Sequence, residues 1–128
     1  MPQKILVIED NQDFREIFTI LIRHLGYEVV EAASAADGMQ KAEDEQPDLV
    51  LLDLVLPHTS GTELTARLKS NRATRNIPVI ICTASIAKEG VHEALRHGAT
   101  EVLTKPISKA FLAEILRRHL ARTRAVDG

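Results

Sequence analysis

The chain has 128 residues, of which 45% are hydrophobic and 27% are charged, and its formal net charge is −2. This composition predicts one soluble globular domain whose core is stable without a disulfide or a metal. The single cysteine, Cys82, excludes an internal disulfide and is typical of a buried residue in a reducing compartment. The apolar runs are far shorter than the ~20 residues of a membrane span, and no export signal is recognisable at the start of the sequence.

Short apolar runs alternate with longer stretches of helical periodicity, beginning near the amino terminus. Residues 4–8 predict a first strand and residues 27–31 a second. The helix between them is predicted by apolar residues at helical spacing: Phe14, Ile17, Phe18, Leu21, Ile22 and Leu25. Ser34 is expected to cap a second helix that ends before Pro47. Residues 49–52 are apolar without interruption, which is typical of a central strand covered on both faces.

The second half of the chain continues the alternation. A loop over residues 54–60 precedes a third helix, and residues 78–82 and 100–103 predict the fourth and fifth strands. The inward residues of the third helix are expected to be Leu64 and Leu68. The fourth helix carries Val91, Ala94 and Leu95, and the last helix carries Leu112, Ile115, Leu116 and Leu120. Ser108 is expected to cap the last helix.

Strands that alternate with helices at this spacing predict right-handed crossovers, a parallel sheet and helices on both of its faces. The fold class is therefore α/β, a doubly wound three-layer sandwich. Because no repeat or linker divides the chain, we assign residues 1–122 to one domain and residues 123–128 to a C-terminal tail.

Polar residues follow four of the five predicted strands at the points where the strands end. Glu9 and Asp10 follow the first strand, Asp53 the third, Thr83 the fourth and Lys105 the fifth. In an open parallel sheet the site lies beyond the carboxyl ends of the strands. If these strands are neighbours, three carboxylates, one hydroxyl and one ammonium converge on a single pocket.

This set of side chains suits a divalent cation and a phosphoryl group. Carboxylates held close together repel, and at neutral pH they either raise a pKa or recruit a cation. Mg²⁺ prefers oxygen ligands and keeps several waters, and no second Cys or His is placed to suggest zinc. Lys105 and Thr83 are suited to the oxygens of a transferring phosphoryl group. Asp53 stands alone at the end of the central strand and is the best placed nucleophile, whereas Glu9 and Asp10 are better suited to hold the ion.

Four segments in order resemble the receiver domain of two-component response regulators. They are Val-Ile-Glu-Asp-Asn at residues 7–11, Leu-Leu-Asp at 51–53 continuing to Gly61, Ile-Ile-Cys-Thr-Ala at 80–84, and Thr-Lys-Pro at 104–106. The resemblance covers the chain from Lys4 to about Leu120. It implies a flavodoxin-like (βα)5 fold with the strand order 2-1-3-4-5.

The resemblance also implies what the site residues do. Asp53 accepts a phosphoryl group from the phosphohistidine of a sensor histidine kinase or a histidine phosphotransfer protein. The implied residues are Asp53 for phosphorylation; Glu9, Asp10, Asp53 and the carbonyl of Val55 for Mg²⁺; and Thr83, Ala84 and Lys105 for phosphoryl binding and switching. The bond before Pro106 is expected to be cis, which would aim the preceding lysine inward.

Partners are expected on two surfaces. Phosphorylation is expected to shift a surface on the fourth helix, fifth strand and fifth helix, with Lys88, Glu89, His92, Arg96 and Lys109. Kinase docking in the family uses the first helix and the loop after Pro106, where the candidates are Arg15, Ile20, His24 and Ile107. The downstream protein is not identified. Near-balanced charge and 3% aromatic residues disfavour direct nucleic-acid binding, and with no membrane segment we expect a cytoplasmic protein.

Two features depart from the family or bear on its tuning. Val102 stands three residues before the site lysine, where receiver domains commonly have Tyr or Phe, so movement of Thr83 and its loop is expected to carry the switch. Val55 and Ser85, two residues beyond Asp53 and Thr83, offer no acid to activate water, which favours a long-lived phosphoryl group. The histidines lack ligand spacing and are expected at the surface: His24, His58, His92, His97 and His119.

Several functional alternatives remain open. The start at Met1 and the short tail favour a single-domain regulator. We expect it to catalyse only its own phosphorylation and dephosphorylation. It could instead pass the group to a histidine on another protein, or be the receiver part of a longer chain. An aspartate-nucleophile phosphatase usually has a second aspartate where this chain has Val55. An unphosphorylated receiver-like scaffold would normally have lost part of the acidic set.

Overall fold

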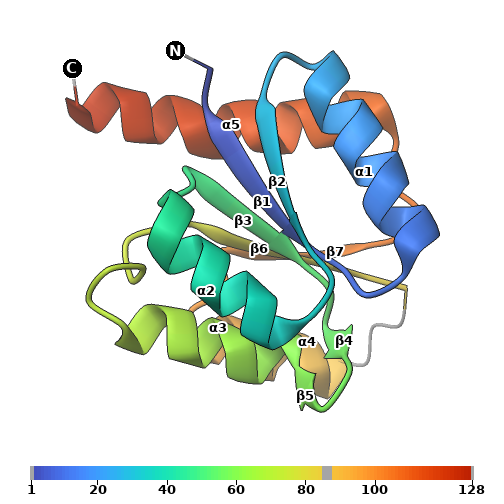
Figure 1. The fold of residues 1–128 in the computed structure, drawn as a ribbon, viewed down its shortest axis with the longest axis vertical. Coiled ribbons are helices and arrows are strands. Elements are labelled where there is room, and N and C mark those ends of the chain that lie inside the picture. The colour runs from blue at the N-terminus through green and yellow to red at the C-terminus, as the bar shows by residue number, and fades with distance from the viewer. Residues whose placement is uncertain (1, 85–87, 128) are drawn as a thin grey trace.

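The computed structural model describes residues 2–84 and 88–127, with side chains described for 2–84 and 90–120. The main sheet has five parallel strands in the order β2-β1-β3-β6-β7 (Figure 1). Its strands are β1 (Lys4–Ile8), β2 (Glu28–Ala32), β3 (Leu49–Leu52), β6 (Val79–Thr83) and β7 (Glu101–Thr104). The helices are α1 (Gln12–His24), α2 (Ala35–Glu45), α3 (Gly61–Ser70), α4 (Lys88–Arg96) and α5 (Lys109–Asp127). The flavodoxin-like arrangement expected from the sequence is confirmed.

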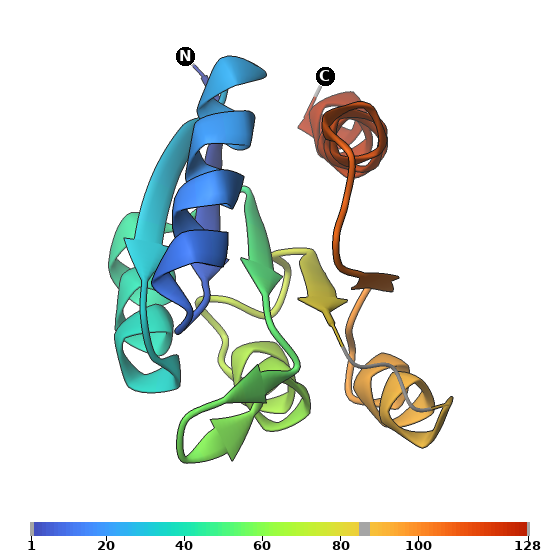
Figure 2. The ribbon, with the colours of Figure 1, turned by 90° about the vertical axis from the view of Figure 1, so that its right-hand side faces the viewer.

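The sheet is the middle of three layers. Helices α1 and α5 cover one face, and α2, α3 and α4 cover the other (Figure 2). Strand β3 supplies both cores, because Leu49 and Leu51 pack on the α1 side while Val50 and Leu52 pack on the α2 side. All four side chains are buried, as predicted for a central strand.

Serine and asparagine side chains begin the helices. Ser34 Oγ accepts from the N–H of Asp37, and Ser108 Oγ accepts from the N–H of Phe111, so both predicted caps are confirmed. Asn11 caps α1 in the same way, directly after the acidic pair. Three strands begin and end one residue later than predicted, since they span residues 28–32, 79–83 and 101–104.

Leu64 and Leu68 are buried on α3, as predicted. Ile17 and Leu95 are exposed, because the buried stripes of α1 and α4 are narrower than the apolar pattern in the sequence. The predicted loop over residues 54–60 contains a short antiparallel hairpin of β4 (Val55–Leu56) and β5 (Thr59–Ser60). Helix α5 continues through Asp127, into the segment that we assigned to a tail.

Within the described residues, no helix combines the length and apolar character needed to cross a bilayer.

The expectation that every histidine lies at the surface is wrong for His119. This side chain is buried on α5, and its Nε2 contacts the carboxylate of Glu101 at the start of β7. His119 lies seven residues after Leu112, on the inward face of the helix, and a buried polar ring needs such a partner. The other four histidines are exposed.

Gly61, the first residue of α3, packs directly against the segment that follows β3. Its N–H donates to the carbonyl oxygen of Leu54 at 2.6 Å. A Cβ atom at Gly61 would lie 2.3 Å from the carbonyl oxygen of Asp53 and 2.8 Å from the Cα of Leu54. Only glycine lets α3 approach this closely, so Gly61 helps to fix the backbone of Asp53.

We expect Gly61→Ala to destabilise the protein by ~2 kcal/mol, because the added methyl group forces the backbone around Asp53 to move. Gly90→Ala is the matched control, since its Cβ would meet Leu54 Cδ2 at an ordinary 3.4 Å within helix α4. That substitution is expected to stabilise by ~0.5–1 kcal/mol. Urea unfolding followed by circular dichroism measures both, and equal effects of the two substitutions would contradict this view of Gly61.

Candidate functional site

The predicted site residues converge at the carboxyl ends of four neighbouring strands. Ile8 and Leu52 are register partners in β1 and β3, so Glu9 and Asp53, which follow them, are neighbours. Thr83 and Thr104 are partners in β6 and β7, and the N–H of Lys105 donates to the carbonyl oxygen of Thr83 at 2.9 Å. The convergence predicted from the strand ends is therefore confirmed.

A buried ammonium lies between two carboxylates. Lys105 Nζ contacts Glu9 Oε1 and donates to Asp53 Oδ2 at 3.0 Å. The side chains of Lys105, Glu9 and Asp53 are only 4%, 3% and 12% exposed. Nζ also lies 4.1 Å from the centroid of the Phe14 ring, a cation–π contact from α1 that the sequence pattern did not predict.

Burial and pairing act in opposite directions on the ionisation of this cluster. Burial raises the pKa of the Glu9 carboxyl above its ordinary value, although hydrogen bonds from Lys105 and from the N–H of Asn11 oppose the shift. Burial alone would lower the pKa of Lys105, but its hydrogen bonds to Glu9 and Asp53 outweigh burial and raise that pKa. Lys105 is therefore a fixed positive charge at neutral pH.

Both carboxylates are also held by backbone N–H groups. Glu9 Oε2 accepts from the N–H of Asn11 at 3.2 Å, and Asp53 Oδ1 accepts from the N–H of Val55 at 3.2 Å. The N–H of Asp53 itself donates to the carbonyl oxygen of Ile8 at 3.2 Å. Each carboxylate thus has one oxygen on the lysine and one on the chain, which fixes its orientation.

The acidic residues form a set of oxygen donors that fits a divalent cation. Carboxylate oxygens of Glu9, Asp10 and Asp53 all lie within 4.8 Å of one another. Oxygens around Mg²⁺ sit at ~2.1 Å from the ion and therefore at most ~4.2 Å apart, so small side-chain adjustments complete such a set. Glu9 is buried whereas Asp10 is exposed, so one side of this acidic cluster is open to water.

The remaining predicted site residues lie around this cluster. Thr83, the last residue of β6, is buried, and Ala84 after it is exposed. Val55, the first residue of β4, is exposed two residues after Asp53. The Lys105-Pro106 bond is cis, as predicted. Ser85 lies outside the described residues, and so do the side chains of Lys88 and Glu89.

Arg15, one of the four docking candidates, makes contacts within the protein. Its guanidinium is half-buried and faces the turn that carries the acidic pair, where Nη1 donates to the carbonyl oxygen of Glu9 at 2.8 Å. Its position in the first turn of α1, directly after the acidic motif, could have suggested an inward role. His24 and Ile20 are exposed, and Ile107 is half-buried against the core under α1 and α5.

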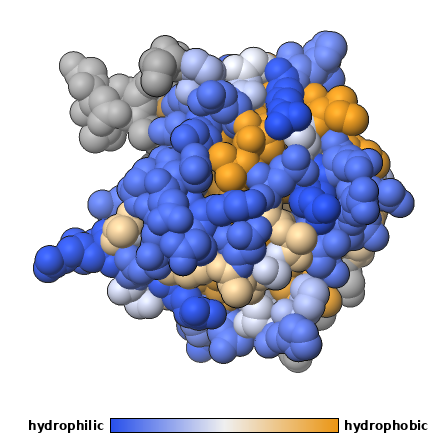
Figure 3. Space-filling view, viewed as in Figure 1, coloured by the Kyte–Doolittle hydropathy of each residue, from blue (hydrophilic) through white to orange (hydrophobic). Residues whose placement is uncertain are grey.

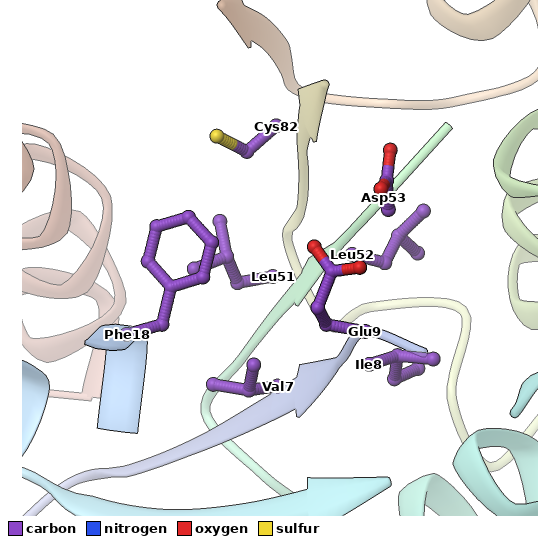
Figure 4. A pocket seen from close by; sticks show the side chains of 8 residues that line it. All are labelled: Val7, Ile8, Glu9, Phe18, Leu51, Leu52, Asp53 and Cys82. Atoms are coloured by element: carbon purple, nitrogen blue, oxygen red, sulfur yellow. The ribbon is translucent and has the colours of Figure 1, made fainter. Parts of the chain in front are cut away.

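A packing gap too small to hold a water molecule lies beside the carboxylates of Glu9 and Asp53. Figure 4 shows these carboxylates on one side and the Phe18 ring and the Cys82 thiol on the other. Cys82 is 1% exposed, and burial raises the pKa of its thiol to about 12. The prediction of a buried small residue is confirmed for Cys82.

Comparison with known proteins identifies relatives that cover nearly the whole chain. A family model described as the response regulator receiver domain matches residues 5–117. The polar-differentiation response regulator DivK of Brucella anthropi is 36% identical over 121 residues, which cover 94% of this chain and 98% of DivK. A CheY-like receiver domain protein from Methanospirillum hungatei has a TM-score of 0.92 at 28% identity, with 100% of both chains covered.

A third relative was solved with a bound metal. The receiver domain of a sensor histidine kinase from Pseudomonas aeruginosa is 30% identical, covers 94% of this chain and 99% of its own, and has a TM-score of 0.87. That structure has a magnesium ion coordinated in the active-site cleft.

The doubly wound sheet and the cluster at its carboxyl edge define a two-component signalling module. This chain belongs to the response regulator receiver domain family.

We expect the Cys82 thiol to be unreactive in the folded protein. With a pKa of about 12, only ~1 in 10,000 molecules carries the thiolate at pH 8, and burial excludes the reagent as well. Reaction with Ellman's reagent should therefore be very slow in buffer and fast in denaturing urea. Rapid reaction of the folded protein would show that this side of the site opens to solvent.

Proposed function

We propose that this chain transmits a signal by accepting a phosphoryl group on Asp53. The support is the buried contact of Lys105 with Glu9 and Asp53, which places one fixed ammonium beside one partly accessible carboxylate. The donor is the phosphohistidine of a sensor histidine kinase or of a histidine phosphotransfer protein. An Asp53 carboxylate oxygen forms a bond to phosphorus, the P–N bond of the phosphohistidine breaks, and the released imidazole takes a proton from water.

The chain's own residues prepare Asp53 for this step. Hydrogen bonds from Lys105 Nζ and from the N–H of Val55 fix the carboxylate. The ammonium of Lys105 then attracts the oxygens of the incoming group, where negative charge builds up. We also assign Thr83 and Ala84 to the phosphoryl oxygens. The backbone of Thr83 is hydrogen-bonded to that of Lys105, and Ala84 directly follows Thr83.

Glu9, Asp10 and Asp53, with the carbonyl of Val55, are the residues that would hold Mg²⁺. Their clustering and all-oxygen donor set support this assignment. When bound, Mg²⁺ supplies positive charge that offsets the repulsion between the carboxylates and the phosphoryl oxygens. Glu9 and Asp10 are positioned next to each other by the turn between β1 and α1.

The output surface proposed for the phosphorylated state lies on α4, β7 and α5. A doubly negative group on Asp53 would draw Thr83 and its loop toward the site and alter the position of α4. Val102, half-buried against the core on the α2 side, occupies the place of the family's aromatic residue. His92, Arg96 and Lys109 are exposed on this surface and are candidates for contact with a downstream protein.

The donor protein is proposed to dock on α1 and the loop after Pro106. Ile20 is 65% exposed on α1, and Ile107, in the loop after Pro106, packs against the core under α1 and α5. The face seen in Figure 3 is mainly hydrophilic, with hydrophobic areas between the polar side chains. Ile17 and Ile20 are both exposed and lie three residues apart on α1, so they form an apolar pair that a donor protein could contact.

Asp53→Asn is expected to abolish modification by acetyl phosphate, since an amide oxygen is a poor nucleophile toward phosphorus. Wild-type protein incubated with Mg²⁺ and acetyl phosphate should gain the mass of one phosphoryl group on the peptide that contains Asp53, and chelation of Mg²⁺ by EDTA should prevent the gain. Repeated release of free phosphate would support the phosphatase alternative instead. Absence of any modification of the wild type would contradict the proposed function.

Ile20→Asp is expected to slow phosphoryl transfer from autophosphorylated histidine kinases by ~10-fold or more, because a charge replaces an apolar contact. Labelling by acetyl phosphate, which needs no docking, should stay unchanged. Leu95→Asp, which changes an exposed leucine on α4, is the matched control and should leave donor transfer unaffected. Equal rates for Ile20→Asp and wild type with a panel of purified kinases would exclude this docking surface.

A further inference from the structure

An arginine in the first turn of α1 connects the backbone of both acidic residues in the β1–α1 turn. Arg15 Nη1 donates to the carbonyl oxygen of Glu9 at 2.8 Å and lies 3.5 Å from the carbonyl oxygen of Asp10. Both contacts are to backbone carbonyl groups and not to the carboxylates of Glu9 and Asp10. It therefore acts on the position of the chain that carries them.

Arg15 is held in turn by Glu31 at the carboxyl end of β2. Arg15 Nε lies 3.5 Å from Glu31 Oε1, and the arginine side chain is only 18% exposed. Glu31 is the register partner of Val7, which packs in the core under α1 and α5. Since neighbouring partners in a parallel sheet share a face, the Glu31 side chain lies on the α1 side.

The backbone of Glu31 is fixed from the opposite layer. Lys41 of α2 donates through Nζ to the carbonyl oxygen of Glu31 and pairs with Asp37 one turn earlier at 3.1 Å. A continuous set of contacts thus runs from α2 through Glu31 and Arg15 to the turn between β1 and α1. The edge strand β2, which contributes no residue to the site itself, supports the site in this way.

We propose that Arg15 is a positioning residue for the turn that carries Glu9 and Asp10, and that Glu31 acts through Arg15. The inference rests on the proposed function, because it concerns how tightly the site holds Mg²⁺. Fixing two successive carbonyl groups restricts the backbone of both candidate ligands and hence the directions of their carboxylates. Groups that orient metal ligands without touching the metal typically contribute ~10-fold to ~100-fold to metal affinity.

A purely electrostatic role of Arg15 predicts the opposite sign. Arg15 carries a positive charge close to a cation site, so removing that charge alone would strengthen Mg²⁺ binding. Loss of positioning weakens Mg²⁺ binding instead. The substitution Arg15→Ala therefore separates the two roles by the direction of the change.

The experiment follows backbone amide shifts of Asp10 and Asp53 by NMR while Mg²⁺ is added to the full chain. Arg15→Ala is expected to raise the dissociation constant for Mg²⁺ by ~10-fold or more. Arg15→Lys, which keeps the charge but has only one nitrogen, should lie between Arg15→Ala and wild type. Glu31→Gln should weaken binding less, and should change it by less than ~2-fold when Arg15 is already alanine, because the two residues act together.

Arg23→Ala is the matched control, since it removes the same charge from the other end of α1, ~12 Å along the helix axis. Its dissociation constant for Mg²⁺ should stay within ~2-fold of wild type. A second readout is the acetyl phosphate reaction: Arg15→Ala should raise the Mg²⁺ concentration for half-maximal labelling of Asp53 more than it lowers the rate at saturating Mg²⁺. A residue that only stabilised the fold would not produce this difference.

Unchanged or tighter Mg²⁺ binding by Arg15→Ala overturns the proposal. If Arg15→Ala does not fold, Arg15→Lys and Glu31→Gln decide, and wild-type affinity in both overturns it equally. Failure of the proposed function has a different signature, since the wild type would then bind no Mg²⁺ and gain no phosphoryl group on Asp53.

Discussion

The site depends on the burial of one ammonium group between carboxylates from two other strands. An unpaired charge in the interior is strongly unfavourable, so the buried position of Lys105 depends on its pairing with Glu9 and Asp53. The two carboxylates, in turn, repel each other unless the ammonium lies between them. This mutual requirement joins the ends of β1, β3 and β7 more specifically than apolar packing alone, which tolerates small shifts in register and orientation.

The same constraint leaves the site short of positive charge. Three carboxylates meet a single ammonium, and only part of the acidic set is screened by water, because Glu9 is buried while Asp10 is exposed. A cation or an electropositive phosphorus atom at the open side relieves this imbalance. The apolar residues behind the site, with Phe18 and Cys82 among them, keep water away from the other side (Figure 4). The cluster thus has an excess of negative charge on the side that faces solvent, and apolar side chains pack against it on the side that faces the core.

The sequence predicted this fold and cluster well, because both follow from simple rules. Continuous burial of β3 came from an uninterrupted apolar run, and the site came from polar residues at the ends of strands. The failures concern side chains with mixed character. Periodicity cannot tell an apolar residue inside a helix stripe from one at its margin, as for Ile17. The histidines were assigned to the surface because they lack ligand spacing, and this argument does not detect a histidine that is buried beside a partner, as His119 is. The inward role of Arg15 depends on contacts with β2 that no local pattern contains.

The large sequence separation between the members of the cluster has a consequence for biosynthesis. Lys105 is 96 residues from Glu9 and 52 from Asp53, so a ribosome has made the other four strands of the sheet before the ammonium exists. A nascent chain that ends before β7 already has its acidic residues but lacks the group that separates them, and their repulsion opposes a native arrangement of the first strands. Competence for the proposed chemistry is therefore gained only after the fifth parallel strand has been made and has joined the edge of the sheet beside β6.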